Sequence, residues 1–290
     1  MSDVSAAVDA ARRGVRRLAV LGSPISHSKS PALHAAAYRV LGLDWEYRAI
    51  EMDGAGLPAF MDGLDASWRG LSLTMPLKHD VVPLLGWRDR VAEVTGAVNT
   101  VLFADGGRRL GFNTDVGGIV GALREADAGD VGRAMIIGAG ATAASALAAL
   151  AELGAHRVDV AVRTPDKAAA LGAFGDRLGV EVRIAPDGLD LLGRAGDADL
   201  VVSTLPGGTV LPVEASEVLR RSSTLFDVAY SPWPSRLAAS WQVAGGRVVP
   251  GIGMLLHQAV LQVRIFVGGD PATPLPDEPA VIDAMRRALA

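Results

Sequence analysis

A glycine-rich turn between a predicted strand and a predicted helix constrains the fold of this chain more than any other feature. The apolar run 134–137 leads into a Gly-x-Gly-x-x-Ala pattern at Gly138, Gly140 and Ala143, and an Ala- and Leu-rich segment follows. Gly138 permits a tight turn, Gly140 lets the backbone approach a pyrophosphate, and Ala143 fits where helix meets strand. Amides at the start of the helix then favour phosphate. The residues predicted to bind a dinucleotide are Gly138, Ala139, Gly140, Ala141, Thr142 and Ala143. The alternative is a tight turn that binds nothing.

Predicted strands and helices alternate along the rest of the chain. After the turn, strands are expected at 158–162, 180–184, 200–203, 225–228 and 247–249, with a helix from about Asp166. This spacing is typical of a doubly wound parallel sheet. Before the turn, strands are expected at 18–22, 45–50, 70–74, 98–103 and 109–112, with helices capped by Ser30 and spanning 55–66. That order predicts an α/β unit with a mixed sheet.

The last 40 residues are expected to form helices that pack back on the first half of the chain. The run 251–267 predicts one long apolar-striped helix, and an amphipathic helix follows a proline-rich stretch. We therefore expect two α/β domains with a cleft between them. One comprises residues 1–115 plus 252–290, and the other comprises residues 116–251. Residues 1–16 predict a polar or partly helical extension that is poorly ordered.

Composition excludes several classes of protein. The 290 residues contain no cysteine, which excludes disulfides, Cys-ligated zinc and a thiol nucleophile. A net charge of −4 and the lack of a basic face argue against nucleic acid as a partner. No run approaches the ~18 apolar residues of a membrane span, so we expect a cytoplasmic protein. The histidines do not show metal-ligand spacing, and no metal is expected.

The residues that follow the predicted strand 158–162 bear on the choice of nicotinamide cofactor. Asp159 lies at the distance of a ribose-binding acid, but it falls inside the strand. Arg163 and Thr164 leave the strand, and Lys167 follows one turn later. Arg and Lys suit a 2′-phosphate, and a threonine hydroxyl can donate to it. These residues favour NADP; the alternative is three ordinary solvated side chains.

A lysine stands where the surrounding sequence predicts a buried strand end. Leu71 and Leu73 alternate with polar residues, and Pro76 ends the strand because it cannot donate to a ladder. Lys78 therefore leaves the end of a sheet, where α/β proteins build their sites. A lysine among apolar side chains can carry a proton, because burial lowers its pKa.

Several polar segments complete a set that lies in order over residues 18 to 269. The matching stretches are Gly22-Ser23-Pro24-Ile25-Ser26-His27-Ser28-Lys29-Ser30-Pro31, Leu73-Thr74-Met75-Pro76-Leu77-Lys78, Gly96-Ala97-Val98-Asn99-Thr100, Gly111-Phe112-Asn113-Thr114-Asp115, Gly138-Ala139-Gly140, Arg163-Thr164, Asp227-Val228-Ala229-Tyr230-Ser231-Pro232 and Met254 to Gln258. Each stretch alone is weak, but the set in this order is specific and resembles the shikimate dehydrogenase family.

The resemblance implies reversible reduction of 3-dehydroshikimate to shikimate by NADPH, in the chorismate pathway of aromatic amino-acid biosynthesis. It implies a substrate domain formed by both ends of the chain and a Rossmann-type NADP domain between them. Lys78 and Asp115 would form the catalytic pair. Ser28 and Ser30 would bind the substrate carboxylate with Tyr230 nearby. The residues implied to bind substrate hydroxyls are Thr74, Asn99 and Gln258, and those implied to lie against the nicotinamide are Gly251 and Met254.

Some positions depart from the pattern of the family that the chain resembles. Ser72 stands where an Asn is usual, which predicts a weaker polar contact near the site. Val162 stands for an Asn before Arg163, which removes a contact on the adenosine side. These departures keep two alternatives open. One is a paralogue that uses quinate or an aminoshikimate with NAD or NADP, and the other is a non-catalytic nucleotide-binding regulator. Either a monomer or a homodimer fits the sequence.

Overall fold

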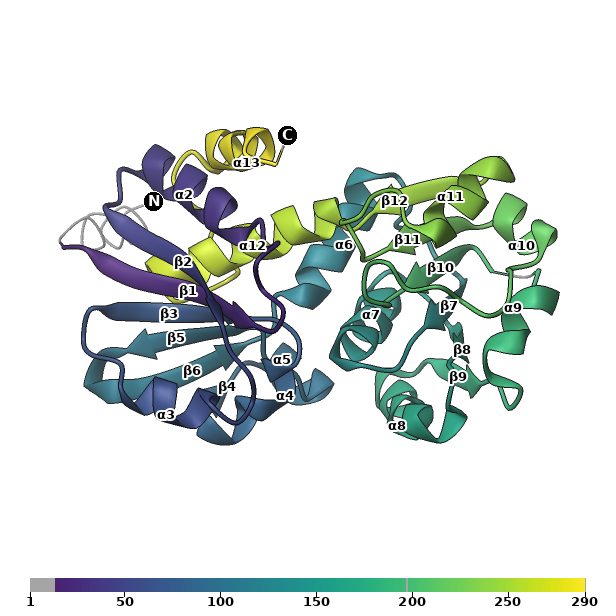
Figure 1. Ribbon diagram of the computed structural model, residues 1–290, viewed down its shortest axis with the longest axis horizontal. Helices are drawn as coiled ribbons and strands as arrows, with labels where there is room; N and C mark the ends of the chain where they lie inside the picture. The colour runs from purple at the N-terminus through teal and green to yellow at the C-terminus, as the bar shows by residue number, and fades with distance from the viewer. Residues whose placement is uncertain (1–13, 197, 290) are drawn as a thin grey trace. The chain divides into compact units, whose positions relative to one another are not determined.

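The computed structural model describes residues 14–196 and 198–289 (Figure 1). They form two compact units. The first contains the described residues up to Thr114 and those from Gln258 onward, and the second runs from Asp115 to His257. Of the predicted extension at 1–16, residues 1–13 lie outside the described residues, and Arg16 already belongs to a strand. In the described part of the chain, no helix combines the length and apolar character needed to cross a membrane.

The first unit is built on a mixed six-stranded sheet of order β2-β1-β3-β5-β6-β4. Its strands are β1 (Arg16–Gly22), β2 (Trp45–Glu51), β3 (Trp68–Leu73), β4 (Trp87–Arg88), β5 (Thr100–Ala104) and β6 (Arg108–Phe112). Strands β2, β1 and β3 are parallel, whereas β5 runs antiparallel to both β3 and β6. The carboxyl ends of β1 and β3 therefore meet at one edge of the sheet.

Helices cover both faces of this sheet (Figure 1). They are α2 (Ser30–Leu41), α3 (Leu57–Asp62), α4 (Leu77–Asp80), α5 (Arg90–Thr95), the later part of α12 (Ile252–Gly268) and α13 (Glu278–Arg287), with short 3₁₀ turns η1 (Val82–Leu84) and η2 (Asp105–Gly107). Side chains alternate across a strand. Leu71 and Leu73 of β3 accordingly enter the core that includes Leu57 and Leu77 of α3 and α4. The intervening Ser72 faces α12.

The start of α2 differs from the sequence prediction. Ser30 is not the capping residue, because the helix already includes it and Lys29 takes the cap position without a side-chain bond. The hydroxyl of Ser28 instead accepts a hydrogen bond from the Ser30 N–H at 3.3 Å. The predicted cap was therefore wrong by one position. The sequence prediction also missed β4, α4 and α5, which have two, four and six residues and are too short for a periodic pattern.

The second unit is a doubly wound parallel sheet of order β12-β11-β10-β7-β8-β9. Its strands are β7 (Arg133–Ile137), β8 (Arg157–Ala161), β9 (Glu181–Ile184), β10 (Leu200–Ser203), β11 (Thr224–Asp227) and β12 (Arg247–Pro250). All neighbouring pairs are parallel. The chain proceeds from β7 towards β9 and then returns to the other side of β7. The strand order therefore reverses at β7, where such sheets bind ligands. The predicted fold class is confirmed.

Helices and 3₁₀ turns surround the second sheet. They are α6 (Asp115–Glu125), α7 (Ala141–Glu152), α8 (Ala169–Leu178), α9 (Leu191–Arg194), α10 (Glu217–Ser222), α11 (Arg236–Val243), the first part of α12, η3 (Pro165–Ala168) and η4 (Gly188–Asp190). The helix predicted from Asp166 begins as the 3₁₀ turn η3 and becomes α-helical only at Ala169. The buried Trp241 of α11 anchors one face, and its indole N–H donates to Ser223 Oγ at 3.3 Å.

A glycine in β3 lets α12 pack closely on the first sheet. A Cβ atom at Gly70 would lie 2.4 Å from the Phe266 ring and 2.6 Å from the backbone oxygen of Val101. Both distances are shorter than a real carbon contact allows. This close approach holds the later part of α12, with its two glutamines, against the strands.

We expect Gly70→Ala to destabilise the first unit by about 1–3 kcal/mol, because overpacking displaces α12. Thermal unfolding monitored by circular dichroism measures the change. Gly268→Ala is the matched control, since nothing lies within 4 Å of its added Cβ. An equal Tm for the two variants would contradict this account of the packing.

Candidate active site

The segment that carries Lys78 is fixed to the end of β1. The Thr74 N–H donates to Leu21 O at 2.9 Å, and the Ser23 N–H donates to Met75 O at 3.0 Å. The chain then turns through Pro76 into α4, where Lys78 is half-buried. The backbone oxygen of Lys78 accepts the Val98 N–H at 2.9 Å. Thr74 and Lys78 thus lie at the carboxyl edge of the first sheet.

The loop that carries Ser28 and leads to Ser30, the first residue of α2, leaves β1 at the same edge. Glu51, at the end of β2, holds this loop by accepting the Ser23 hydroxyl at 2.6 Å and the Ile25 N–H at 3.2 Å. The Ser28 N–H donates to Ile25 O at 3.0 Å. Ser28 is half-buried and Ser30 is buried. The sequence prediction missed Glu51, although an acid at a strand end beside a loop rich in hydroxyls was a usable signal.

The orientation of the Asn99 amide is fixed by its hydrogen bonds. The backbone N–H of Thr114 donates to Asn99 Oδ1 at 2.9 Å, and the Thr100 hydroxyl donates to the same oxygen at 2.9 Å. A backbone N–H can only donate, so the oxygen of the amide must face Thr114 N. The Asn99 amino group therefore points to the Thr114 hydroxyl, at 2.9 Å, and towards Gln258 Oε1, at 3.4 Å.

Asn99, Thr114 and Gln258 thus form one buried polar cluster from three distant parts of the chain. Their exposed fractions are 2%, 2% and 8%. The structure brings together Asn99 and Gln258, both predicted as substrate-binding residues. Thr114 lay in a matched motif, but the sequence prediction gave it no role.

A second layer of polar side chains lies beneath this cluster. Gln262, one turn after Gln258 on α12, is 2% exposed. It accepts the Ser72 hydroxyl at 2.9 Å and donates to Thr100 Oγ1 at 3.0 Å. Ser72, which was predicted to give a weaker contact, therefore has a buried partner. The sequence prediction missed Gln262, although two glutamines four residues apart on an apolar helix share one face.

His34 closes this layer from α2. Its Nε2 lies 3.3 Å from Gln262 Oε1, its Nδ1 lies 3.0 Å from the Tyr38 hydroxyl, and its ring stacks on Tyr47 at 3.9 Å. Complete burial lowers the pKa of His34 from 6.5 to about 3, although its hydrogen bond to Gln262 opposes the shift. The imidazole is therefore neutral at physiological pH.

The glycine-rich turn of the second unit has the geometry expected of a phosphate site. Gly138 has φ of +117°, and a Cβ there would lie 2.3 Å from Thr204 Oγ1, so only glycine fits. Gly140 is exposed, with nothing within 4 Å of an added Cβ. No side chain caps α7, which begins at Ala141. Its first amides thus remain available for an anion. Ala143 is fully buried, as its predicted packing role requires.

Three exposed polar residues follow β8. Arg163, Thr164 and Lys167 are exposed, and the Lys167 N–H donates to Thr164 O at 3.1 Å, which folds them into one turn. Asp159 lies within β8, where it pairs with Arg157 at 3.0 Å. Asp159 is thus paired with Arg157 inside the strand. The turn of Arg163, Thr164 and Lys167 follows the carboxyl end of that strand and carries basic and hydroxyl groups.

The remaining predicted residues of the second unit lie near the ends of β11 and β12. A Cβ at Gly251 would lie 2.1 Å from the Val228 backbone oxygen, so the two segments touch. Met254 is buried on α12. Tyr230 is half-buried, and this burial raises its pKa. Asp227 holds the turn before Tyr230 by accepting the Ala229 N–H at 3.2 Å.

The predicted pairs that link the two units remain predictions. Lys78 belongs to the first unit, whereas Asp115 is buried at the start of α6 in the second. Ser28 and Ser30 likewise belong to the first unit and Tyr230 to the second. Within the described residues, no group of three His, Asp or Glu side chains could hold a metal ion.

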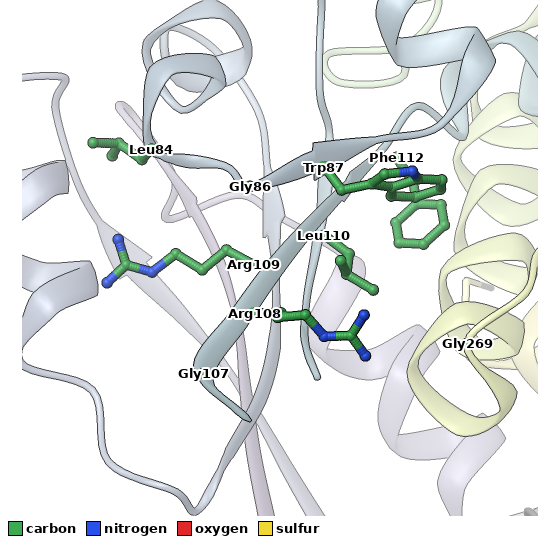
Figure 2. A pocket seen from close by; sticks show the side chains of 9 residues that line it. All are labelled: Leu84, Gly86, Trp87, Gly107, Arg108, Arg109, Leu110, Phe112 and Gly269. Carbon is green, nitrogen blue, oxygen red and sulfur yellow. The ribbon is translucent and has the colours of Figure 1, made fainter. Parts of the chain in front are cut away.

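A hollow of about 610 Å³ lies elsewhere on the first unit, beside β4 and β6. Figure 2 shows Trp87 next to Phe112 in this hollow, with Arg108 below them. The ring centroids of Trp87 and Phe112 lie 5.4 Å apart. None of the predicted site residues lines it. The residues of the first unit that are predicted to bind substrate lie instead near the edge where β1 and β3 end.

Comparison with known proteins identifies the family. Residues 20–101 match the model of the shikimate dehydrogenase substrate binding domain. A protein of Rubrobacter xylanophilus named shikimate dehydrogenase (NADP(+)) is 37% identical over 278 residues, which cover 93% of this chain and 94% of that protein. The chain belongs to the shikimate dehydrogenase family. This finding confirms the family that the sequence motifs predicted.

Solved structures of the family share the fold. The crystal structure of the Mycobacterium tuberculosis shikimate dehydrogenase matches with a TM-score of 0.80 at 39% identity, covering 94% of this chain and 99% of that one. The Thermus thermophilus enzyme, crystallised with NADP(H) and shikimate, matches with a TM-score of 0.78 at 33% identity, with the same coverage.

The burial of His34 makes the stability of this family member depend on pH. Because the folded-state pKa lies below the unfolded value, His34 contributes stability above pH 6.5 that is lost as pH falls towards 3. Between pH 6.5 and pH 3, we expect His34 to lower the free energy of unfolding by up to ~1.4 kcal/mol for each unit by which the pH falls. Urea unfolding of wild type and His34→Gln at pH 7 and pH 5 measures the difference. Identical pH dependences would contradict a neutral buried His34.

Proposed function

We propose that this chain catalyses the reversible NADPH-dependent reduction of 3-dehydroshikimate to shikimate in aromatic amino-acid biosynthesis. It is an oxidoreductase that acts on a CH–OH group. The observation that carries the proposal is the buried cluster of Asn99, Thr114 and Gln258, whose fixed amides suit a polyhydroxylated ring. The names of the relatives support the same reaction, since they are NADP-dependent shikimate dehydrogenases.

The first unit is the substrate domain, and the second unit, from Asp115 to His257, is the NADP domain. The Asn99 amino group and Gln258 bind ring hydroxyls together with Thr74. Ser28 and Ser30 donate to the substrate carboxylate from the loop that Glu51 holds. Tyr230 assists them from the second unit. Charge-assisted bonds of this kind give both affinity and orientation.

Lys78 and Asp115 carry the proton chemistry. Hydride arrival at the ketone carbon builds negative charge on the oxygen, and the Lys78 ammonium stabilises that charge and donates the proton. Asp115 holds the lysine in place and favours its charged form. The nicotinamide supplies the hydride, and the protein orients the two reacting carbons. The reaction needs no metal.

NADP lies on the glycine-rich turn of the second unit. Gly140 leaves room for the pyrophosphate, and the first amides of α7 would donate to its oxygens. Arg163, Thr164 and Lys167 would donate to the 2′-phosphate at the end of β8. Gly251 and Met254 lie against the nicotinamide. The partner of the protein is thus a small molecule, and we expect a monomer or homodimer in the cytoplasm without nucleic-acid or membrane partners.

The test of this function is the 340 nm absorbance rise when the enzyme is mixed with shikimate and NADP. Parallel reactions use NAD in place of NADP, and quinate or an aminoshikimate in place of shikimate. A rise with shikimate and NADP, and little with the others, is expected. A rise only with another pair would favour the paralogue, and no rise from folded, cofactor-binding protein would favour the regulator.

Lys78→Ala should lower turnover by about 10²–10⁴-fold, because the developing alkoxide loses its proton donor. The affinity for NADP should change little, since Lys78 lies outside the NADP domain. Steady-state kinetics and fluorescence titration with NADP measure the two effects. Near-normal turnover in this variant would remove Lys78 from the mechanism.

Arg163→Ala should raise the KM for NADP about 10- to 100-fold, because a charge-assisted bond to the 2′-phosphate is lost. The KM for NAD should stay unchanged. Arg183→Ala, which removes another exposed arginine of the second unit, is the matched control. Equal effects on NADP and NAD would show that Arg163 does not read the phosphate.

A further inference from the structure

Gln262 is enclosed among four polar groups beneath the substrate cluster. Its Oε1 lies 2.9 Å from Ser72 Oγ and 3.3 Å from His34 Nε2. Its Nε2 lies 3.0 Å from Thr100 Oγ1 and 3.3 Å from Asn99 O. The side chain is 2% exposed, so water does not compete for these contacts.

The donors and acceptors around Gln262 allow only one orientation of its side-chain amide. Asn99 O is a carbonyl and can only accept, so the amino group of Gln262 must face it. The amide oxygen then accepts from the Ser72 hydroxyl and from His34 Nε2. This assignment places the proton of the neutral His34 on Nε2, and its Nδ1 accepts the Tyr38 hydroxyl.

Thr100 links the orientation of the Gln262 amide to that of the Asn99 amide. Its hydroxyl accepts from Gln262 Nε2, so its own proton is free to point to Asn99 Oδ1, at 2.9 Å. That bond adds to the one from the Thr114 N–H, so two donors hold the amide oxygen of Asn99. The amino group of Asn99 consequently faces Thr114 Oγ1 and Gln258.

We propose that Gln262 is a positioning residue for substrate binding: through Thr100 it stabilises the orientation of the Asn99 amide that the Thr114 N–H sets. This role rests on the proposed function of Asn99 as a hydroxyl ligand of shikimate. Gln262 itself lies in the layer beneath the cluster and acts on the substrate through Asn99. A merely structural role, in which Gln262 only holds α12 on the sheet, makes different predictions.

Gln262→Leu keeps the size of the side chain and removes its polar contacts. We expect the KM for shikimate to rise about tenfold, the loss of roughly one oriented hydrogen bond, while the KM for NADP stays within about twofold. Thr100→Val should likewise raise the KM for shikimate and leave the KM for NADP within about twofold. The double variant should be no worse than either single variant, because both substitutions break the same relay of hydrogen bonds from Gln262 through Thr100 to Asn99. Additive effects of the two substitutions would overturn the relay.

A core truncation in the same unit separates positioning from stability. Leu57→Ala opens a cavity in the buried cluster on the opposite face of the sheet, so it should lower Tm without raising the KM for shikimate. If Gln262→Leu lowered Tm in the same way and left that KM unchanged, Gln262 would be structural only and the proposal would fail.

A readout without turnover distinguishes this proposal from the proposed function. The side-chain amide signal of Asn99, in nuclear magnetic resonance spectra of the full-length protein, should shift or broaden in Gln262→Leu. An unchanged signal would overturn the positioning role, whatever the activity. If the wild type failed to oxidise shikimate while the signal responded to Gln262→Leu, the proposed function would fail but the orienting role would stand.

Discussion

The hydrogen bond from the Thr114 backbone N–H to Asn99 Oδ1, at 2.9 Å, is the contact on which the proposed substrate site depends. It joins the segment before β5 to the segment after β6, two antiparallel strands that pair directly. Because a backbone N–H has no alternative role, the bond decides which end of the Asn99 amide accepts and which donates. The donor end is then available to the cluster that includes Gln258.

The sheet and α12 together make this cluster rigid. Gly70 leaves room for Phe266, and the close approach brings two glutamines of one helix face against β3 and β5. Buried polar groups are costly unless every one is paired. Here Gln262 has partners for both its oxygen and its nitrogen, so the layer can be buried and still hold the residues above it in one orientation.

Features that depend on neighbours in the chain were predictable from the sequence. The turn at Gly138 and Gly140, the strand that leads to Lys78 and the parallel second sheet follow from local patterns of glycine, proline and apolar residues. The short elements α4 and β4 carry no periodicity and were missed. The cap of α2 was misplaced, because Ser28 and Ser30 both suit a helix start and only the folded backbone decides between them.

Polar contacts between distant segments could not be predicted from pattern alone. His34 and Gln262 are separated by 228 positions, and Asn99 and Gln258 by 159. Their pairing follows from the strand order and from the packing of α12, and local sequence patterns reveal neither of these. The substrate role of Gln258 was predicted only through the family resemblance, whereas Gln262, outside every matched motif, was found only in the structure.

The measurement that tests this account most directly is a crystal structure of the protein with shikimate and NADP. We predict a ring hydroxyl of shikimate within hydrogen-bond distance of Asn99 Nδ2, and the carboxylate against the hydroxyls of Ser28 and Ser30. Asn99 Oδ1 should still accept the Thr114 N–H. Shikimate bound away from these residues, or an Asn99 amide turned the other way, would contradict the account.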